Sequence, residues 1–294
     1  APNLQLETYN RIVYDRVLEK LTGKAEGKKP LKERLADFNQ SMWYITRSKE
    51  GELKVYAYIM CWAQLKENRA WEYLKEVYGD ALAEDEGDSN YNVVLTIPDS
   101  DPNPEEYAKK ASKLLTNMLI APAMVLAKEV NDGSAKEGEL VQIDYRPGES
   151  YWIKQGVDRL TILFSVKFED KDDAVFGRVF INEFSKGAPG CPSCDVVTRK
   201  NAPPPKELEG AQGLVDDNCY LTFILEKRYL ANPAKVLEAL VTCRNYINFH
   251  IKCSKAFLHI RMRNKVSQLL LVLNRAKPER EVEKKTASGR TFKK

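Results

Sequence analysis

Two cysteines, Cys191 and Cys194, have the CxxC spacing that zinc knuckles and redox motifs use. A structural zinc site needs about four ligands, but the chain has no second CxxC, and Cys219 stands alone. A redox pair is expected at the start of a helix beside a βαβ unit, whereas these cysteines lie in a segment rich in proline and glycine. We therefore expect neither a metal site nor a redox site.

The other residues with catalytic potential also lack the spacing that a reaction needs. His250 and His259 are nine residues apart on a predicted helix, so they point in opposite directions and share no metal. The acidic run 169–173 lacks the alternation and the twelfth-position glutamate of a calcium loop. The segment 23–29 lacks the length and the Ser or Thr of a phosphate-binding loop. The sequence thus predicts a protein that is not an enzyme and binds no cofactor.

The composition indicates a globular protein with an uneven distribution of charge. The chain has 294 residues, of which 43% are hydrophobic, and a net charge of +4. Residues 252–294 hold 13 Lys and Arg against 3 acidic residues, a net charge of +10, so the remainder carries −6. A basic end on an acidic body predicts an acidic partner, which can be nucleic acid, membrane headgroups or an acidic protein.

No apolar run has the length of a transmembrane helix, about 18 residues. The longest run, residues 55–63, has nine. The first residues show no basic segment followed by an apolar one, as a secretory signal would. We therefore expect no membrane insertion and a cytoplasmic location, where the six cysteines stay reduced.

Hydrophobic periodicity and turn residues divide the chain into two halves of similar design. The expected helices are residues 4–21, 67–78 and 104–130, the last with a kink or break at Pro122, and the expected strands are residues 42–46, 53–60, 91–97, 140–145, 150–154, 159–168, 174–184 and 221–225. Segments 42–60 and 150–168 both contain an aromatic strand, a polar turn and a second aromatic strand, which indicates an internal repeat. The polar stretch 131–138 is the best candidate for a linker.

These elements predict an α+β fold with two similar domains, residues 1–130 and 139–294, each a mainly antiparallel sheet packed by helices. Residues 185–217 are expected to form a long loop. Pro233 behind Asn232 is typical of a helix start. Because neither proline nor glycine follows before Pro278, residues 234–276 are expected to form one long C-terminal helix of about 65 Å.

This predicted helix carries apolar residues on two separate faces. One stripe keeps a spacing near 3.6 residues, interrupted by Ser254, and consists of Val236, Leu240, Cys243, Ile247, Ile251, Leu258, Met262, Val266, Leu269 and Leu273. The other stripe lies about 150° around the helix and consists of Tyr246, Phe249, Cys253, Phe257 and Ile260. Each of the two apolar faces needs another protein surface to pack against it. One can be the sheet of the same domain, and the other a helix of another chain or more of this domain.

Basic residues accompany the apolar stripes. Arg244, Lys252, Lys255 and Arg263 fall within an arc of about 100° on the predicted helix. Lysines on a helix commonly do no more than face solvent, but their density near one end of this chain favours a binding surface.

The C-terminal sequence HIKCSKAFLHIRMRNKVSQLLLVLNRAKPE (residues 250–279), which continues to GRTFKK, resembles the actin-related protein 2/3 complex subunit 2 family. Shorter matches in the family's order, ADFNQSMWYI, KEVYG, YNV and KDDAVFGRVFINEF, extend the resemblance over essentially the whole chain. That complex nucleates branched actin filaments. The resemblance implies two similar α/β domains and a long helix that pairs antiparallel with the equivalent helix of subunit 4. It also implies contact with the side of the mother filament.

The resemblance implies a non-catalytic scaffold of the actin cytoskeleton, with subunit 4, the other subunits of the complex and the actin filament as partners. The basic residues to which it gives a filament-facing role are Lys252, Lys255, Arg261, Arg263 and Arg275. The apolar residues expected at the partner-helix interface are Leu240, Ile247, Ile251, Leu258, Met262, Leu269 and Leu273. The segments 185–217 and 84–88 depart from the family, so the resemblance implies no contact for them.

The alternative is a nucleic-acid-binding module that uses the basic C-terminal helix. The aromatic residues near the basic ones lie on the apolar stripe, whereas a platform for stacking bases would interleave them with the lysines. We therefore expect a protein partner and no nucleic acid.

Overall fold

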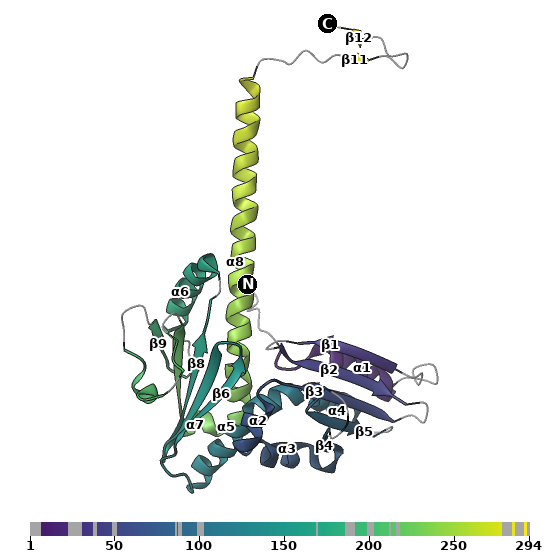
Figure 1. Ribbon diagram of the computed structural model, residues 1–294, viewed down its shortest axis with the longest axis vertical. Helices are drawn as coiled ribbons and strands as arrows, with labels where there is room; N and C mark the ends of the chain where they lie inside the picture. The colour runs from purple at the N-terminus through teal and green to yellow at the C-terminus, as the bar shows by residue number, and fades with distance from the viewer. Residues whose placement is uncertain are drawn as a thin grey trace. The chain divides into compact units, whose positions relative to one another are not determined.

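The computed structural model (Figure 1) describes residues 7–22, 31–37, 40–48, 52–85, 87, 90–98, 103–168, 170–185, 192–198, 203–211, 213–215, 218–277, 284–285 and 291–292. The chain forms two compact units, residues 1–248 and residues 249–294. The first unit holds two five-stranded antiparallel sheets with their helices, which confirms the predicted α+β class.

The first half of the first unit combines one sheet with helices α1 to α5. The strands are β1 (Leu31–Ala36), β2 (Met42–Arg47), β3 (Leu53–Tyr58), β4 (Leu82–Glu84) and β5 (Val93–Ile97), and the helices are α1 (Arg11–Thr22), α2 (Trp62–Glu67), α3 (Ala70–Tyr78), α4 (Pro104–Ser112) and α5 (Leu114–Asp132). The strand order is β1-β2-β3-β5-β4. Buried and half-buried residues alternate along β3 and β5, so one face of the sheet packs on the core.

The second half repeats this arrangement. Its strands are β6 (Leu140–Arg146), β7 (Glu149–Gln155), β8 (Arg159–Val166), β9 (Cys194–Thr198) and β10 (Cys219–Glu226), and its helices are α6 (Lys171–Ser185), α7 (Lys227–Leu230) and the beginning of α8 (Pro233–Arg275). The order β6-β7-β8-β10-β9 matches that of the first sheet. The two segments predicted to be a repeat supply the second and third strands of each sheet, which confirms the repeat.

Strands β8 and β10 are buried on both faces. On one face, part of the predicted 185–217 loop acts as a cover. Leu208 is fully buried there and packs in one cluster with Trp152, Leu163 and Tyr220. The same segment also contains strand β9, so the prediction of a featureless loop is wrong for these residues.

The segment 174–184, expected to be a strand, belongs instead to helix α6. The Asp170 carboxylate accepts the N–H of Asp172 at 2.9 Å and caps the helix start. Buried positions recur every four residues at Asp173, Gly177 and Ile181, which is helical spacing. The β-branched and aromatic composition of the segment favoured a strand, but the cap and the acidic first turn are the stronger signals.

Other boundaries also differ from the prediction. The unpredicted strand β1 lies at a sheet edge, where charged residues are normal. The expected helix 67–78 corresponds to α3, which begins at Ala70. The unpredicted helix α2 ends at Glu67, and Arg69, whose φ of 66° is left-handed, separates the two helices. The run 104–130 breaks at Lys113, and α5 continues through Pro122. Residues 4–6, the segment 23–29 and Cys191 lie outside the described residues.

Helix α5 joins the two halves of the first unit. It contacts β3 of the first sheet and both β7 and β8 of the second. The hydroxyl of Tyr151 on β7 donates to the Leu119 carbonyl of α5 at 2.6 Å. Gln64 on α2 adds a second link, because its amide donates to the Asp144 carboxylate at 3.0 Å and accepts the Asp144 N–H at 2.8 Å. Helix α5 thus packs on both sheets, and buried or half-buried hydrogen bonds fasten α5 and α2 to the second sheet.

Helix α8 is continuous over 43 residues, from Pro233 to Arg275, in agreement with the predicted helix 234–276. Its first part belongs to the first unit, where the apolar residues Leu237, Leu240, Cys243 and Ile247 are buried. A half-buried ion pair also holds this part, since the Lys113 ammonium lies 2.7 Å from the Glu238 carboxylate.

Arg244 is a buried anchor of α8 and does not share the exposed basic arc in which we expected it. Its Nε donates to the two carboxylate oxygens of Glu149 on β7 at 2.9 and 3.1 Å. Its Nη2 donates to the Lys167 carbonyl at 3.0 Å. The side chains of Arg244 and Glu149 are only 9% and 4% exposed. The positive charge of Arg244 is therefore paired inside the fold and does not contribute to a binding surface.

Removing Arg244 should leave the buried Glu149 carboxylate without its strongest partner. We expect Arg244→Met to lower the free energy of unfolding by about 3–5 kcal/mol, measured by urea unfolding of the whole chain at a protein concentration low enough to keep it monomeric. The double variant Arg244→Met, Glu149→Gln also removes the buried carboxylate charge, so it should recover most of the lost free energy of unfolding. Lys128→Ala, which breaks an exposed pair with Glu76, is the control and should cost less than about 1 kcal/mol. A loss no larger than the control's would contradict the anchoring role.

Candidate functional site

The second unit presents most of α8 to solvent. From Lys252 to Lys277 every residue is exposed except Lys255, which is half-buried. The other described elements of this unit are the two-residue strands β11 (Lys284–Lys285) and β12 (Thr291–Phe292), which pair antiparallel. Within the described residues of this unit, the helix is therefore the element that offers a continuous binding surface.

One face of α8 carries exposed apolar side chains. Four residues of the predicted partner interface lie on it, and Leu258, Met262, Leu269 and Leu273 are 41%, 63%, 57% and 51% exposed. Their spacing of four, seven and four residues places them in one row along the helix. The other three predicted residues, Leu240, Ile247 and Ile251, are buried. A partner cannot reach those three, so the accessible apolar row begins at Leu258.

A run of five apolar residues, 269–273, is the strongest feature that our sequence reasoning missed. Each of these side chains is 50–64% exposed. At about 100° per residue they point around the whole circumference of the helix, and a helix that is apolar all round is normally buried. The predicted stripe contained only Leu269 and Leu273 of this run, although the uninterrupted sequence LLLVL already marks all five residues as apolar. None of the helices in the described residues is both long and apolar enough to cross a membrane.

The second predicted stripe is covered only where it begins. The Tyr246 ring packs on Phe180 of α6, with ring centres 6.1 Å apart. Farther along the helix, Phe249, Phe257 and Ile260 are 39%, 58% and 58% exposed. Apolar residues on this side of the second unit therefore also remain open to solvent.

The basic residues of α8 lie on both sides of the apolar row. At about 100° per residue, Lys252, Lys255 and Arg263 fall within about 80°, whereas Arg261 and Arg275 lie on the opposite side of the helix. The Arg261 guanidinium lies over the Phe257 ring, 5.4 Å from its centre, which is cation–π geometry. The five predicted filament-facing residues thus flank the apolar row and do not form a single patch.

Of the two CxxC cysteines, only Cys194 belongs to the described residues, and its thiol is free and buried. Cys194 lies on β9, and burial raises the pKa of its thiol to about 12. Burial likewise raises the pKa of Cys243 to about 12. Protonated thiols are poor nucleophiles near neutral pH. Within the part of the chain that the structure describes, no three His, Cys, Asp or Glu side chains are grouped so that they could hold a metal ion.

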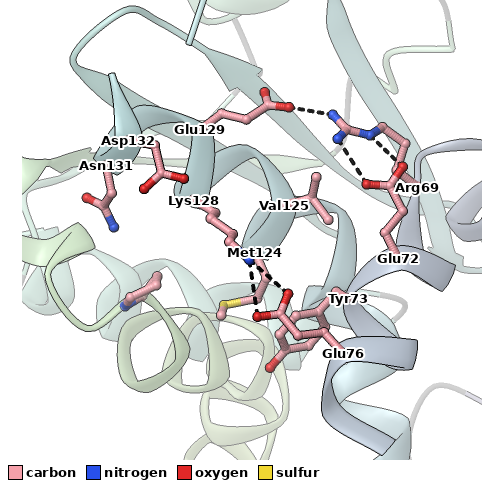
Figure 2. A pocket seen from close by; sticks show the side chains of 11 residues that line it. Arg69, Glu72, Tyr73, Glu76, Met124, Val125, Lys128, Glu129, Asn131 and Asp132 are labelled. Carbon is pink, nitrogen blue, oxygen red and sulfur yellow. Dashed lines mark hydrogen bonds and ion pairs between the residues drawn. The ribbon is translucent and has the colours of Figure 1, made fainter. Parts of the chain in front are cut away.

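A surface pocket of about 450 Å³ lies beside α3 and α5, and five of its charged side chains pair with one another (Figure 2). Arg69 bonds to Glu72 at 3.0 Å and to Glu129 at 2.6 Å, and Lys128 lies 3.0 Å from Glu76. The hydrogen bonds from Arg69 lower the pKa of both carboxyls that it contacts. The apolar lining is Tyr73, Met124 and Val125. Carboxylates with lowered pKa are unsuited to act as general acids, so this pocket shows the character of a salt-bridged surface.

Comparison with known proteins agrees with the resemblance found in the sequence. A family model described as "Arp2/3 complex, 34 kD subunit p34-Arc" matches residues 55–280. "Actin-related protein 2/3 complex subunit 2" of Dictyostelium discoideum is 33% identical over 297 residues, which cover 99% of both chains. The protein of the same name from Schizosaccharomyces pombe is 30% identical over 315 residues, which cover 98% of this chain and 99% of that one. The chain therefore belongs to the p34-Arc family of Arp2/3 complex subunits.

Proposed function

We propose that this chain is a non-catalytic subunit of an actin-related protein 2/3 complex in the cytoplasm. In this role it acts as a scaffold, contacts the side of the mother filament and supports nucleation of branched actin filaments. The observation that carries the proposal is the row of exposed apolar residues on α8 in a chain of this family. Large apolar surfaces on one helix are typical of chains that are stable only in an assembly.

The exposed apolar row fits a helix of another subunit, which we propose to be the long helix of subunit 4. Leu258 and Leu273 are fifteen residues apart, so the row is about 22 Å long. Full burial of a Leu or Met side chain contributes about 1.5–3 kcal/mol. These four residues are about half exposed, so together with the run 269–273 they would contribute several kcal/mol to an interface with a partner helix.

The basic residues beside the row fit an acidic surface, which we propose to be the actin filament. Lys252, Arg261, Arg263 and Arg275 are exposed, and Lys255 is half-buried. Their attraction to the filament accelerates encounter and sets its orientation, and it weakens as salt rises. The apolar row then contributes to assembly, and the flanking charges contribute to filament contact.

Expressed without partners, the full-length chain should self-associate because its apolar row and the run 269–273 stay in water. Light scattering after size exclusion should show oligomers or aggregates that grow with concentration. Co-expression with subunit 4 should convert them to a discrete complex. A stable monomer at high concentration would contradict the proposal of an uncovered interface.

Charges placed in the apolar row should break assembly. An unpaired carboxylate buried in an interface costs about 2 kcal/mol or more, so Met262→Glu with Leu269→Glu should weaken partner binding about a thousandfold. Co-purification of the other subunits measures the effect. Gln268→Glu adds a charge elsewhere on the same helix and should leave the complex intact. Helix content measured by circular dichroism separates loss of binding from unfolding.

Charge reversal beside the row should weaken filament contact while assembly persists. The double variant Lys255→Glu, Arg263→Glu should bind filaments about tenfold more weakly at low salt in co-sedimentation, and the difference should shrink as salt is added. Lys235→Glu makes the same change at an exposed position near the start of α8 and serves as the control. Unchanged filament binding by the double variant would refute the role of these charges.

A further inference from the structure

The surface pocket beside α3 and α5 has walls that the first unit itself holds in place (Figure 2). Its volume of about 450 Å³ lies within the range of ligand-binding pockets, about 300–1,000 Å³. The Arg69 guanidinium at the start of α3 donates to the Glu129 carboxylate of α5 at 2.6 Å. The Asn131 amide at the end of α5 donates to the Leu230 carbonyl of α7 at 2.6 Å. Because these bonds fix α3 and α7 against α5, a ligand would bind here without a large cost of ordering the walls.

The lining of this pocket carries more negative than positive charge. Its charged side chains are two basic and four acidic ones, Arg69, Lys128, Glu72, Glu76, Glu129 and Asp132. The hydrogen bonds from Arg69 lower the pKa of the Glu72 and Glu129 carboxyls, so both stay ionised at neutral pH. The lining therefore has a net charge of −2.

The carboxylates that carry this excess are accessible from solvent. The side chains of Glu72 and Glu76 are 58% and 62% exposed. Asp132 is exposed and lies one helical turn beyond Lys128, on the same face of α5. The Lys128 ammonium bonds to Glu76 at 3.0 Å, whereas Asp132 has no ion pair with any residue that the structure describes. One ammonium thus lies near two carboxylates, and a second cation can reach them.

The apolar part of the lining favours an organic cation over an inorganic one. Tyr73 of α3 and both Met124 and Val125 of α5 line the pocket, and all three are half-buried. A small inorganic cation would gain nothing from this surface. Lysine and arginine side chains, in contrast, pack their methylene groups on apolar surface and keep the charged end at its polar edge. The face of a tyrosine ring also attracts a cation.

We propose that this pocket is a docking site for a basic segment of a partner polypeptide, with one lysine or arginine side chain inside it. The charged end of that side chain contacts the Glu76 and Asp132 carboxylates, and its methylene groups pack on Met124 and Val125. The charge of the lining complements such a segment and is opposite in sign to the basic residues of α8, so the two surfaces select different partners. The site uses residues of the first unit alone and does not depend on the function proposed for α8.

The test uses saturation-transfer difference NMR on the whole chain, at a protein concentration low enough to keep it monomeric. The probe is Nα-acetyl-L-lysine amide, and the matched control is Nα-acetyl-L-norleucine amide, which lacks the ammonium group. We expect the lysine probe to bind at least about fivefold more tightly than the norleucine probe, because it meets uncompensated carboxylates. The difference should shrink as salt is added, since both charges are exposed.

Two variants that break the same ion pair should have opposite effects on the lysine probe. Lys128→Gln makes the lining more negative and frees Glu76, so it should strengthen binding about threefold. Glu76→Gln makes the lining less negative and should weaken binding about threefold. Loss of the pair is common to both variants, so a change in stability cannot explain effects of opposite sign. Asp158→Asn removes an exposed carboxylate outside the lining and should leave binding unchanged.

Three results would overturn the proposal. Absence of binding by the lysine probe, or equal binding of the lysine and norleucine probes, would show that the pocket does not select a cation. Effects of the same sign from Lys128→Gln and Glu76→Gln would show that the probe binds elsewhere. Equal affinity for n-butylammonium, which has the basic side chain without the peptide groups, would overturn the assignment to a polypeptide.

Discussion

The organisation of this protein depends on the unequal burial of one apolar helix. Helix α8 carries apolar side chains along its length, but only its first part is covered within the first unit, where Leu237, Leu240, Cys243 and Ile247 are buried. The ion pair of Arg244 with Glu149 fixes that part to β7. The remaining apolar residues of the helix stay in water, which is unfavourable in proportion to their area. In the proposed function, the surface of a partner subunit covers these residues.

The repeat explains how such a helix arises. In each half a helical segment follows the last strand of the sheet in chain order, α4 and α5 after β5 in the first half and α7 and α8 after β10 in the second. Helix α5 has 19 residues, most of them buried between the two sheets. Helix α8 has 43 residues and is longer than the part that its own sheet buries. The same element is thus a core helix in one half and, by its extra length, an interaction element in the other.

Glu149 is a buried carboxylate of β7 that two arginines share. It contacts Arg244 of α8 at 2.9 Å and Arg146 of β6 at 3.5 Å. An unpaired charge is costly in the interior, so this carboxylate and Arg244 stabilise each other. The shorter contact with Arg244 shows that the helix is the main partner of this carboxylate.

The sequence by itself determined the fold class, the repeat, the family and the continuous helix, because periodicity, turn residues and the absence of Gly and Pro are local properties. It did not reveal that Arg244 is a buried anchor or that Ile247 is covered, since a helical pattern shows which residues share a face but not what lies against it. The strand expected at 174–184 is a helix because its cap and the packing of Gly177 outweigh β propensity. The buried contact of Arg244 with Glu149 joins a helix and a strand that are 95 residues apart in the chain. Only the tertiary structure, which brings those segments together, decided it.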